Sequence, residues 1–205
     1  MSLTIDEFER GVTYWRNETK WPHDFHNAFY KEMAVANPRG VFDDFWWAGF
    51  LPVLRAWRAT RPRSSDFLTA RAEVRFARLS QAWELAVEPH LAGDIESLQW
   101  SDVSAFPAIV AEIKDVDSPV FASKSCHFLA PRVFPLVDNV AMGNEYPTYE
   151  ACFRAYQREW ATTTAKGIRE DLIARLARLV GPSPAEDFPF KNKVVELCLI
   201  GRYQA

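Results

Sequence analysis

Apolar residues recur at spacings of three and four along most of this chain, which is the spacing of one face of an α-helix. The first such stretch places Ile5, Phe8, Val12 and Trp15 on one side. No stretch alternates convincingly between apolar and polar residues, as a half-buried strand would. We therefore expect an all-α fold of roughly nine helices, separated at proline and glycine. The patterns place helices at about 4–20, 24–37, 40–60, 65–87, 104–114, 118–130, 148–160 and 168–179, with others beginning near 139 and 189.

Length and composition limit the class of protein. A chain of 205 residues forms one domain, here 1–205, or two closely packed lobes, 1–92 and 93–205. Because 48% of the residues are hydrophobic and 14% aromatic, the chain can bury a large core. The net charge of −3 argues mildly against strong nonspecific binding to nucleic acid. We expect a monomer.

The cysteines and the first residues indicate a cytoplasmic protein without a cofactor. Cys126, Cys152 and Cys198 form no C-x-x-C pair and fall in apolar surroundings, as reduced, buried thiols do. They are too few for an iron–sulfur cluster, and no metal site is expected. The chain starts without a signal-peptide pattern, and no apolar run reaches about 18 residues, so we expect neither export nor a membrane span.

The stretch from Ser118 to Met142 is the hardest to explain by packing alone. Ser118 and Pro119 start a helix that Pro131 ends, and this apolar helix carries Lys124 and His127. An extended run at 134–137 then leads to Asp138, the expected cap of another helix beginning at Asn139.

A lysine and a carboxylate brought together in this way can perform chemistry. A desolvated lysine has a lowered pKa and can act as an amine nucleophile that forms a Schiff base. A carboxylate beside it can take a proton or stabilise a developing cation. In the alternative interpretation, Lys124 extends to solvent and Asp138 only caps a helix.

The motif Pro119-x-x-x-x-Lys124, followed by an apolar helix and Phe134-Pro135-Leu136-Val137-Asp138-Asn139-Val140, resembles the core of the helix-hairpin-helix DNA glycosylases. The similarity is closest to the 8-oxoguanine DNA glycosylases and to shorter bacterial proteins named as like them. It implies a helical glycosylase fold in which the helices at 104–114 and 118–130 form the hairpin element. It also implies base excision repair of DNA, with Lys124 as the Schiff-base nucleophile and Asp138 as the catalytic carboxylate.

This chain differs from the family pattern at two places. The family hairpin reads roughly L-P-G-V-G-x-K, whereas residues 119–123 of this chain contain no glycine. The sequence Val137-Asp138-Asn139-Val140 stands where the family has V-D-T-H-V. These differences, with the acidic net charge, favour an alternative, a non-catalytic helical module that binds nucleic acid or protein.

Basic residues could contact the phosphates of a DNA substrate. Arg71, Arg75 and Arg78 fall on one face of the helix expected at 65–87, at a spacing suited to gripping phosphates. The alternative is a solvated face paired with acidic residues elsewhere. Lys166 and Ser123 are the other candidates for contact with nucleic acid.

Three aromatic side chains are candidates for the pocket that would hold an extruded base. The side chains of Trp46 and Trp47 point about 100° apart on a helix, so one can be buried while the other stacks on a base. In the alternative, the pair forms an edge of the core. His127 is the third candidate.

Overall fold

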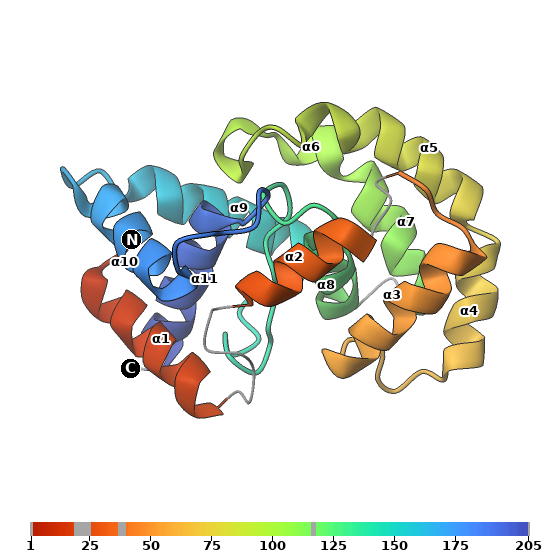
Figure 1. Ribbon diagram of the computed structural model, residues 1–205, viewed down its shortest axis with the longest axis horizontal. Coiled ribbons are helices and arrows are strands. Elements are labelled where there is room, and N and C mark those ends of the chain that lie inside the picture. Colours follow the sequence, from red (N-terminus) through yellow and green to blue (C-terminus); the bar gives the residue numbers. More distant parts are fainter. Residues whose placement is uncertain (1, 19–25, 37–39, 116–117, 205) are drawn as a thin grey trace.

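The computed structural model describes residues 2–18, 26–36, 40–115 and 118–204. Within these ranges the chain forms eleven α-helices and no strand, which confirms the all-α fold (Figure 1). No helix in the described ranges is long and apolar enough to cross a membrane. The helices are α1 (Ile5–Glu18), α2 (Asn27–Ala36), α3 (Asp44–Ala56), α4 (Ser65–Glu73), α5 (Phe76–Ala86), α6 (Trp100–Val103), α7 (Ala105–Lys114), α8 (Pro119–Leu129), α9 (Tyr149–Thr162), α10 (Ile168–Val180) and α11 (Phe190–Tyr203).

The expected helices differ from those observed at two main places. The single helix expected at 65–87 is divided, because the Arg75 amide donates to the Ala72 carbonyl at 2.8 Å and tightens the chain there. The break lets α4 and α5 both pack against α7. The helix expected from Asn139 does not form; residues 139–144 make consecutive turns. The beginning of the second expected helix, before position 26, lies outside the described residues.

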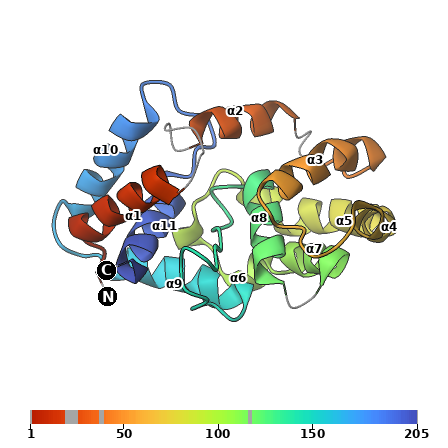
Figure 2. The ribbon, with the colours of Figure 1, turned by 90° about the horizontal axis from the view of Figure 1, so that it is seen from below.

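The first and last long helices pack directly against each other. α1 and α11 lie side by side, next to α10, in both views (Figures 1 and 2). Their backbones touch, since a Cβ atom added at Gly11 would lie 1.9 Å from the Leu197 carbonyl oxygen. Glycine at this position therefore permits the close approach of the two helices. These contacts join a helix of the first expected lobe (1–92) to a helix of the second (93–205).

Helix α8 lies at the centre of the molecule. It packs against α7, α9, α2 and α3, and every side chain from Phe121 to Leu129 is buried. The group formed by α1, α10 and α11 lies on one side of α8, and α3, α4, α5 and α7 lie on the other (Figures 1 and 2). A functional side chain on α8 is therefore placed between these two groups of helices.

Candidate active site

Helix α8 has the predicted bounds but not the predicted cap. It begins at Pro119, whose φ is already suited to a first turn, and it ends at Leu129, before Pro131. The Ser118 side chain makes no capping hydrogen bond within the described residues. Its carbonyl instead accepts from the amides of Phe121 and Ala122 at 3.1 and 3.2 Å, so the backbone alone closes the first turn.

The extended segment 134–137 is fixed by side chains from two helices, α8 and α9. The Ser123 hydroxyl of α8 accepts a hydrogen bond from the Val137 amide at 3.1 Å. From α9, the hydroxyls of Tyr149 and Tyr156 donate to the carbonyls of Pro135 and Leu136, each at 2.9 Å. Together with the hydrogen bond of His127, described below, these bonds fix the backbone conformation of the segment. They set the position of the residue that follows it, Asp138.

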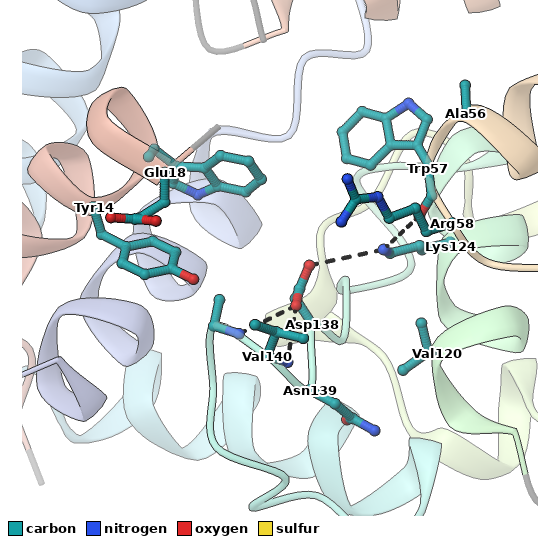
Figure 3. A pocket seen from close by; sticks show the side chains of 12 residues that line it. Tyr14, Glu18, Ala56, Trp57, Arg58, Val120, Lys124, Asp138, Asn139 and Val140 are labelled. Atoms are coloured by element: carbon teal, nitrogen blue, oxygen red, sulfur yellow. Dashed lines mark hydrogen bonds and ion pairs between the residues drawn. The ribbon is translucent and has the colours of Figure 1, made fainter. Parts of the chain in front are cut away.

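Asp138 caps a turn instead of a helix. Its Oδ1 accepts hydrogen bonds from the amides of Val140 and Ala141, at 3.0 and 3.2 Å. The chain then leaves helical geometry, because Gly143 and Asn144 have φ values of +65° and +58°. We call residues 138–144 the Asp138 turn. With Oδ1 occupied by the turn, Oδ2 is directed toward α8 (Figure 3).

Lys124 and Asp138 meet in space. Lys124 Nζ lies 3.7 Å from Asp138 Oδ2 and donates a shorter hydrogen bond, 2.9 Å, to the Trp57 carbonyl oxygen at the end of α3 (Figure 3). The Lys124 side chain is 8% exposed and that of Asp138 25% exposed, so the carboxylate is the more accessible to solvent. The alternative interpretation, in which Lys124 extends to solvent, is therefore wrong, because its amine is held inside the protein.

The surroundings of Lys124 favour the neutral amine. Burial lowers the pKa of Lys124 below its ordinary value of 10.5, and the neighbouring Arg58 guanidinium lowers it further. The carboxylates of Asp138 and Glu196 act in the opposite direction without cancelling the shift. A larger fraction of Lys124 is therefore unprotonated near neutral pH than for a lysine in water, and an unprotonated amine is a nucleophile.

The pair lies in the wall of a cavity of about 600 Å³. One wall comes from α1 and the other from the end of α3, with α8 and the Asp138 turn between them (Figure 3). The His26 ring contacts the indoles of Trp15 and Trp57 edge-on, at centroid distances of 5.2 and 4.9 Å, and so connects the two walls. The lining residues are Tyr14, Trp15, Glu18, Ala56, Trp57, Arg58, Val120, Lys124, Asp138, Asn139, Val140 and Ala141.

Several polar residues of the cavity were not among those predicted from sequence. The Tyr14 hydroxyl points toward Asp138 from α1, Glu18 lies next to Tyr14, and Arg58 lies beside Lys124 (Figure 3). Burial and the charges of Asp138 and Glu18 raise the pKa of Tyr14, so this hydroxyl keeps its proton and can donate. The sequence signals for these residues are weak, since Arg58 is one of many arginines in its tract and Tyr14 lies beside the apolar stripe of α1.

The three arginines proposed to grip phosphates are bound to α7. The Arg71 guanidinium donates to the carbonyls of Glu112 and Ile113, at 2.9 and 3.0 Å. Arg75 and Arg78 form ion pairs with the Glu112 carboxylate at 3.1 and 2.7 Å. The hydrogen bond from Arg78 lowers the pKa of Glu112, as expected for a stable pair. The arrangement corresponds to the alternative of a face paired with acidic residues.

Lys166 and Ser123 also lie outside the cavity lining. Lys166 is exposed in the connection between α9 and α10. Ser123 is completely buried, and its hydroxyl is engaged with the Val137 amide. Ser123 therefore positions the segment before Asp138 and has no access to a phosphate.

The three candidates for a base pocket are core residues. Trp46 stacks on Phe50 with ring centroids 5.0 Å apart, and the Trp47 indole donates to the Thr69 hydroxyl at 3.0 Å. His127 is 0% exposed. None of the three lines the cavity, whose aromatic walls are instead Trp15, Trp57 and Tyr14.

The hydrogen bonds of His127 define its protonation. Nδ1 lies 2.7 Å from the Phe134 carbonyl, which can only accept, so Nδ1 carries the proton. Nε2 then accepts from the Tyr30 hydroxyl at 2.6 Å. Burial, with the charge of Lys193, lowers the pKa of His127 to about 3, and the ring is neutral at physiological pH.

No family model, curated protein or solved structure matches this chain. The geometry of the cavity is therefore the basis for assigning a function.

Proposed function

We propose that this chain is a DNA glycosylase with an associated lyase activity, in which Lys124 is the nucleophile and Asp138 transfers protons. The observation that carries the proposal is the 3.7 Å approach of these two side chains in the wall of a 600 Å³ cavity. That volume lies within the range of about 300–1,000 Å³ found for small-molecule sites, enough for a nucleoside rotated out of a duplex. The similarity of the motif around Lys124 and Asp138 to the helix-hairpin-helix glycosylases supports the same assignment.

In the first step, Asp138 accepts a proton from Lys124, and the nitrogen lone pair attacks C1′ of the extruded nucleotide. The new C1′–N bond forms as the glycosidic bond breaks. The electron pair of that bond leaves with the base, which takes up a proton. The Trp57 carbonyl keeps Nζ oriented during the attack, since it accepts one of the amine hydrogens at 2.9 Å.

The second step would cleave the DNA strand. The nitrogen lone pair expels the ring oxygen O4′, which gains a proton, and a protonated Schiff base remains at C1′. Loss of a proton from C2′ to a base, such as Asp138, allows the C3′–O bond to break, and the 3′ phosphate departs with that electron pair. Water then hydrolyses the Schiff base and regenerates Lys124.

One chain supplies the whole arrangement. Lys124, Asp138 and both described cavity walls come from the same polypeptide, so the proposed chemistry needs no residue from a second subunit. Its three cysteines are free and buried, which suits a reducing, cytoplasmic environment. Binding to DNA would rely on residues around the cavity, because Arg71, Arg75 and Arg78 are occupied by α7.

The test is borohydride trapping on duplex DNA with one abasic site, together with excision assays on duplexes that carry single damaged bases. Wild-type protein should form a covalent adduct, and Lys124→Met should form none. Lys191→Met is the matched control, because Lys191 is also ion-paired, with Asp94 at 2.8 Å, but lies outside the cavity. The thermal melt of each variant checks its folding. Wild-type protein that gives neither adduct nor excision would overturn the proposal.

The internal pairing of the arginine face favours a second candidate, a non-catalytic helical module that binds a partner. Because Arg75 and Arg78 are paired with the Glu112 carboxylate, the arginine face has less positive charge available for binding phosphates. This candidate predicts that Lys124→Met leaves partner binding intact. Duplex affinity measured at low salt, with and without an abasic site, separates the two candidates.

A further inference from the structure

Arg58 occupies a backbone position that normally selects glycine. It follows Trp57, the C-cap residue of α3, and has a φ of +56°. The Ala59 amide donates to the Leu54 carbonyl and the Arg58 amide to the Arg55 carbonyl, each at 2.9 Å, which is the hydrogen-bond pattern of a Schellman motif. Glycine is usual at the left-handed position of this motif because other residues are strained there. The strain at this position is a reason to look for a role of the arginine side chain.

Two buried lysines hold the backbone on either side of Arg58. Lys124 donates to the Trp57 carbonyl at 2.9 Å, and Lys114 donates to the Ala59 carbonyl at 2.7 Å. Both neighbours of Arg58 in the chain are buried, while Arg58 itself is exposed. The strained conformation is therefore rigidly supported from the protein interior. The Arg58 side chain starts from a fixed point at the edge of the cavity.

The Arg58 guanidinium extends over the cavity next to the Lys124 amine (Figure 3). Its charge is close enough to contribute to the electrostatics of Lys124. Within the described part of the chain, no carboxylate forms an ion pair with Arg58, in contrast to Arg75 and Arg78. A guanidinium that forms no ion pair with a described carboxylate, beside a nucleophile, is suited to binding the anionic part of a substrate.

We propose that Arg58 binds a phosphate group of the sugar whose C1 carbon reacts with Lys124. This inference rests on the proposed function and narrows it, because it makes a phosphorylated sugar the recognised unit. A guanidinium can donate two parallel hydrogen bonds to phosphate oxygens, which fixes the sugar as well as attracting it. The phosphate would hold the reacting carbon near Nζ while Asp138 remains available for proton transfer.

The test compares two small aldehydes, 2-deoxyribose and 2-deoxyribose 5-phosphate, as probes for Schiff-base formation at Lys124. Each condenses with the amine to an iminium ion with loss of water, and borohydride reduces the iminium to a stable secondary amine. Mass spectrometry then measures modification of Lys124. We expect the phosphorylated sugar to react about 10-fold faster or more, since a charge-assisted hydrogen bond is worth that much. Arg58→Gln should remove the preference.

Arg55→Gln is the matched control, because Arg55 lies on α3, three residues before Arg58, but donates to the Ser65 hydroxyl and does not line the cavity. This variant should keep the preference for the phosphorylated sugar. Equal rates for the two sugars on wild-type protein would overturn the phosphate site and leave Lys124 as the nucleophile. No reaction with either sugar would overturn both. If Arg58→Gln slowed both sugars equally, Arg58 would only tune the amine, and the phosphate site would be wrong.

A second variant, Arg58→Gly, separates binding from folding. Glycine relieves the strain of the left-handed backbone, so the melting temperature should rise by about 2–4 °C. The same variant should lose the preference for 2-deoxyribose 5-phosphate. A lower melting temperature would show that the Arg58 side chain contributes to packing, and would contradict its assignment to a ligand.

Discussion

Lys124 and Asp138 lie 3.7 Å apart, but the shorter hydrogen bond of Lys124, at 2.9 Å, goes to the Trp57 carbonyl. The carbonyl orients the amine, and the carboxylate partly offsets the effect of burial on its charge. Burial favours the neutral amine and Asp138 favours the protonated one, so the two influences act against each other. Removing the carboxylate should therefore change the pH at which Lys124 reacts.

Asp138→Asn should lower the pKa of Lys124 further, because it removes the charge that raises it while burial remains. The rate of reductive methylation of Lys124 by formaldehyde and cyanoborohydride, followed by mass spectrometry from pH 6 to 10, should therefore shift to lower pH. Base excision by the same variant should fall about 100-fold, since proton transfer is lost. A shift to higher pH would contradict the role of Asp138.

Ser123→Ala should destabilise the protein and displace Asp138. The Ser123 hydroxyl accepts the Val137 amide at 3.1 Å in the interior, and its removal leaves that amide without this partner. The expected loss is about 1–3 kcal/mol in the free energy of unfolding, measured by urea denaturation. Excision should fall as well, because Asp138 follows Val137 directly.

Ser125→Ala is the matched control on the same helix. The Ser125 side chain is also buried, but its hydroxyl has no hydrogen-bond partner in the described part of the chain. Removing an unpaired buried hydroxyl should leave the stability unchanged or raise it slightly. Equal losses for Ser123→Ala and Ser125→Ala would show that the Ser123–Val137 bond contributes nothing specific.

The features predicted from sequence are those that nearby residues determine. The bounds of α8 follow from Pro119 and Pro131, and the all-α fold follows from the spacing of apolar residues. The meeting of Lys124 and Asp138 was also predictable, because a short connection links the two segments that carry them. The helix expected after Asp138 was not observed, because Gly143 and Asn144 take left-handed conformations a few residues later.

The features that could not be predicted from the sequence depend on contacts between distant parts of the chain. Glu112 forms ion pairs with Arg75 and Arg78 only because α7 packs against α5. Tyr14 enters the cavity because α1 packs against α11, at the opposite end of the chain. The position of Arg58 at the cavity follows from the end of α3, and the sequence there has no glycine that would indicate a helix end. No local pattern distinguishes such residues from ordinary surface residues.

Acid should destabilise the protein through His127. The pKa of His127 is about 3 in the folded protein and 6.5 when exposed, so the unfolded state binds the additional proton between these values. The free energy of unfolding should therefore fall as the pH drops below 6.5, by about 1.4 kcal/mol per pH unit from this residue. Urea denaturation at pH 4, 5 and 6 measures the slope.

His127→Gln should flatten this slope by that amount, although it also lowers stability at pH 7 through loss of the bonds to Tyr30 and Phe134. His90→Gln makes the same substitution at a half-buried position outside the core and serves as the control for the change of residue type. An unchanged slope in His127→Gln would mean that His127 can take up a proton without unfolding.

A buried ion pair behind the cavity should affect both stability and the reactivity of Lys124. Lys193 Nζ lies 2.7 Å from Glu196 Oε2 on α11, and both side chains are 1% exposed. Glu196 also raises the pKa of Lys124, which couples this pair to the proposed nucleophile. Removing either partner alone leaves the other charge buried, at a cost of about 3–5 kcal/mol.

The double variant Lys193→Met/Glu196→Leu separates these two effects. It removes both charges together, so its stability should recover to within about 1–2 kcal/mol of wild type in a urea-denaturation cycle. The Glu196 charge is still absent, so formaldehyde should react with Lys124 at lower pH than in wild-type protein. If stability recovers and the pH dependence is unchanged, the pair contributes only to packing. If the pH dependence shifts to lower pH, the Glu196 carboxylate contributes to the charge of Lys124 without lining the cavity.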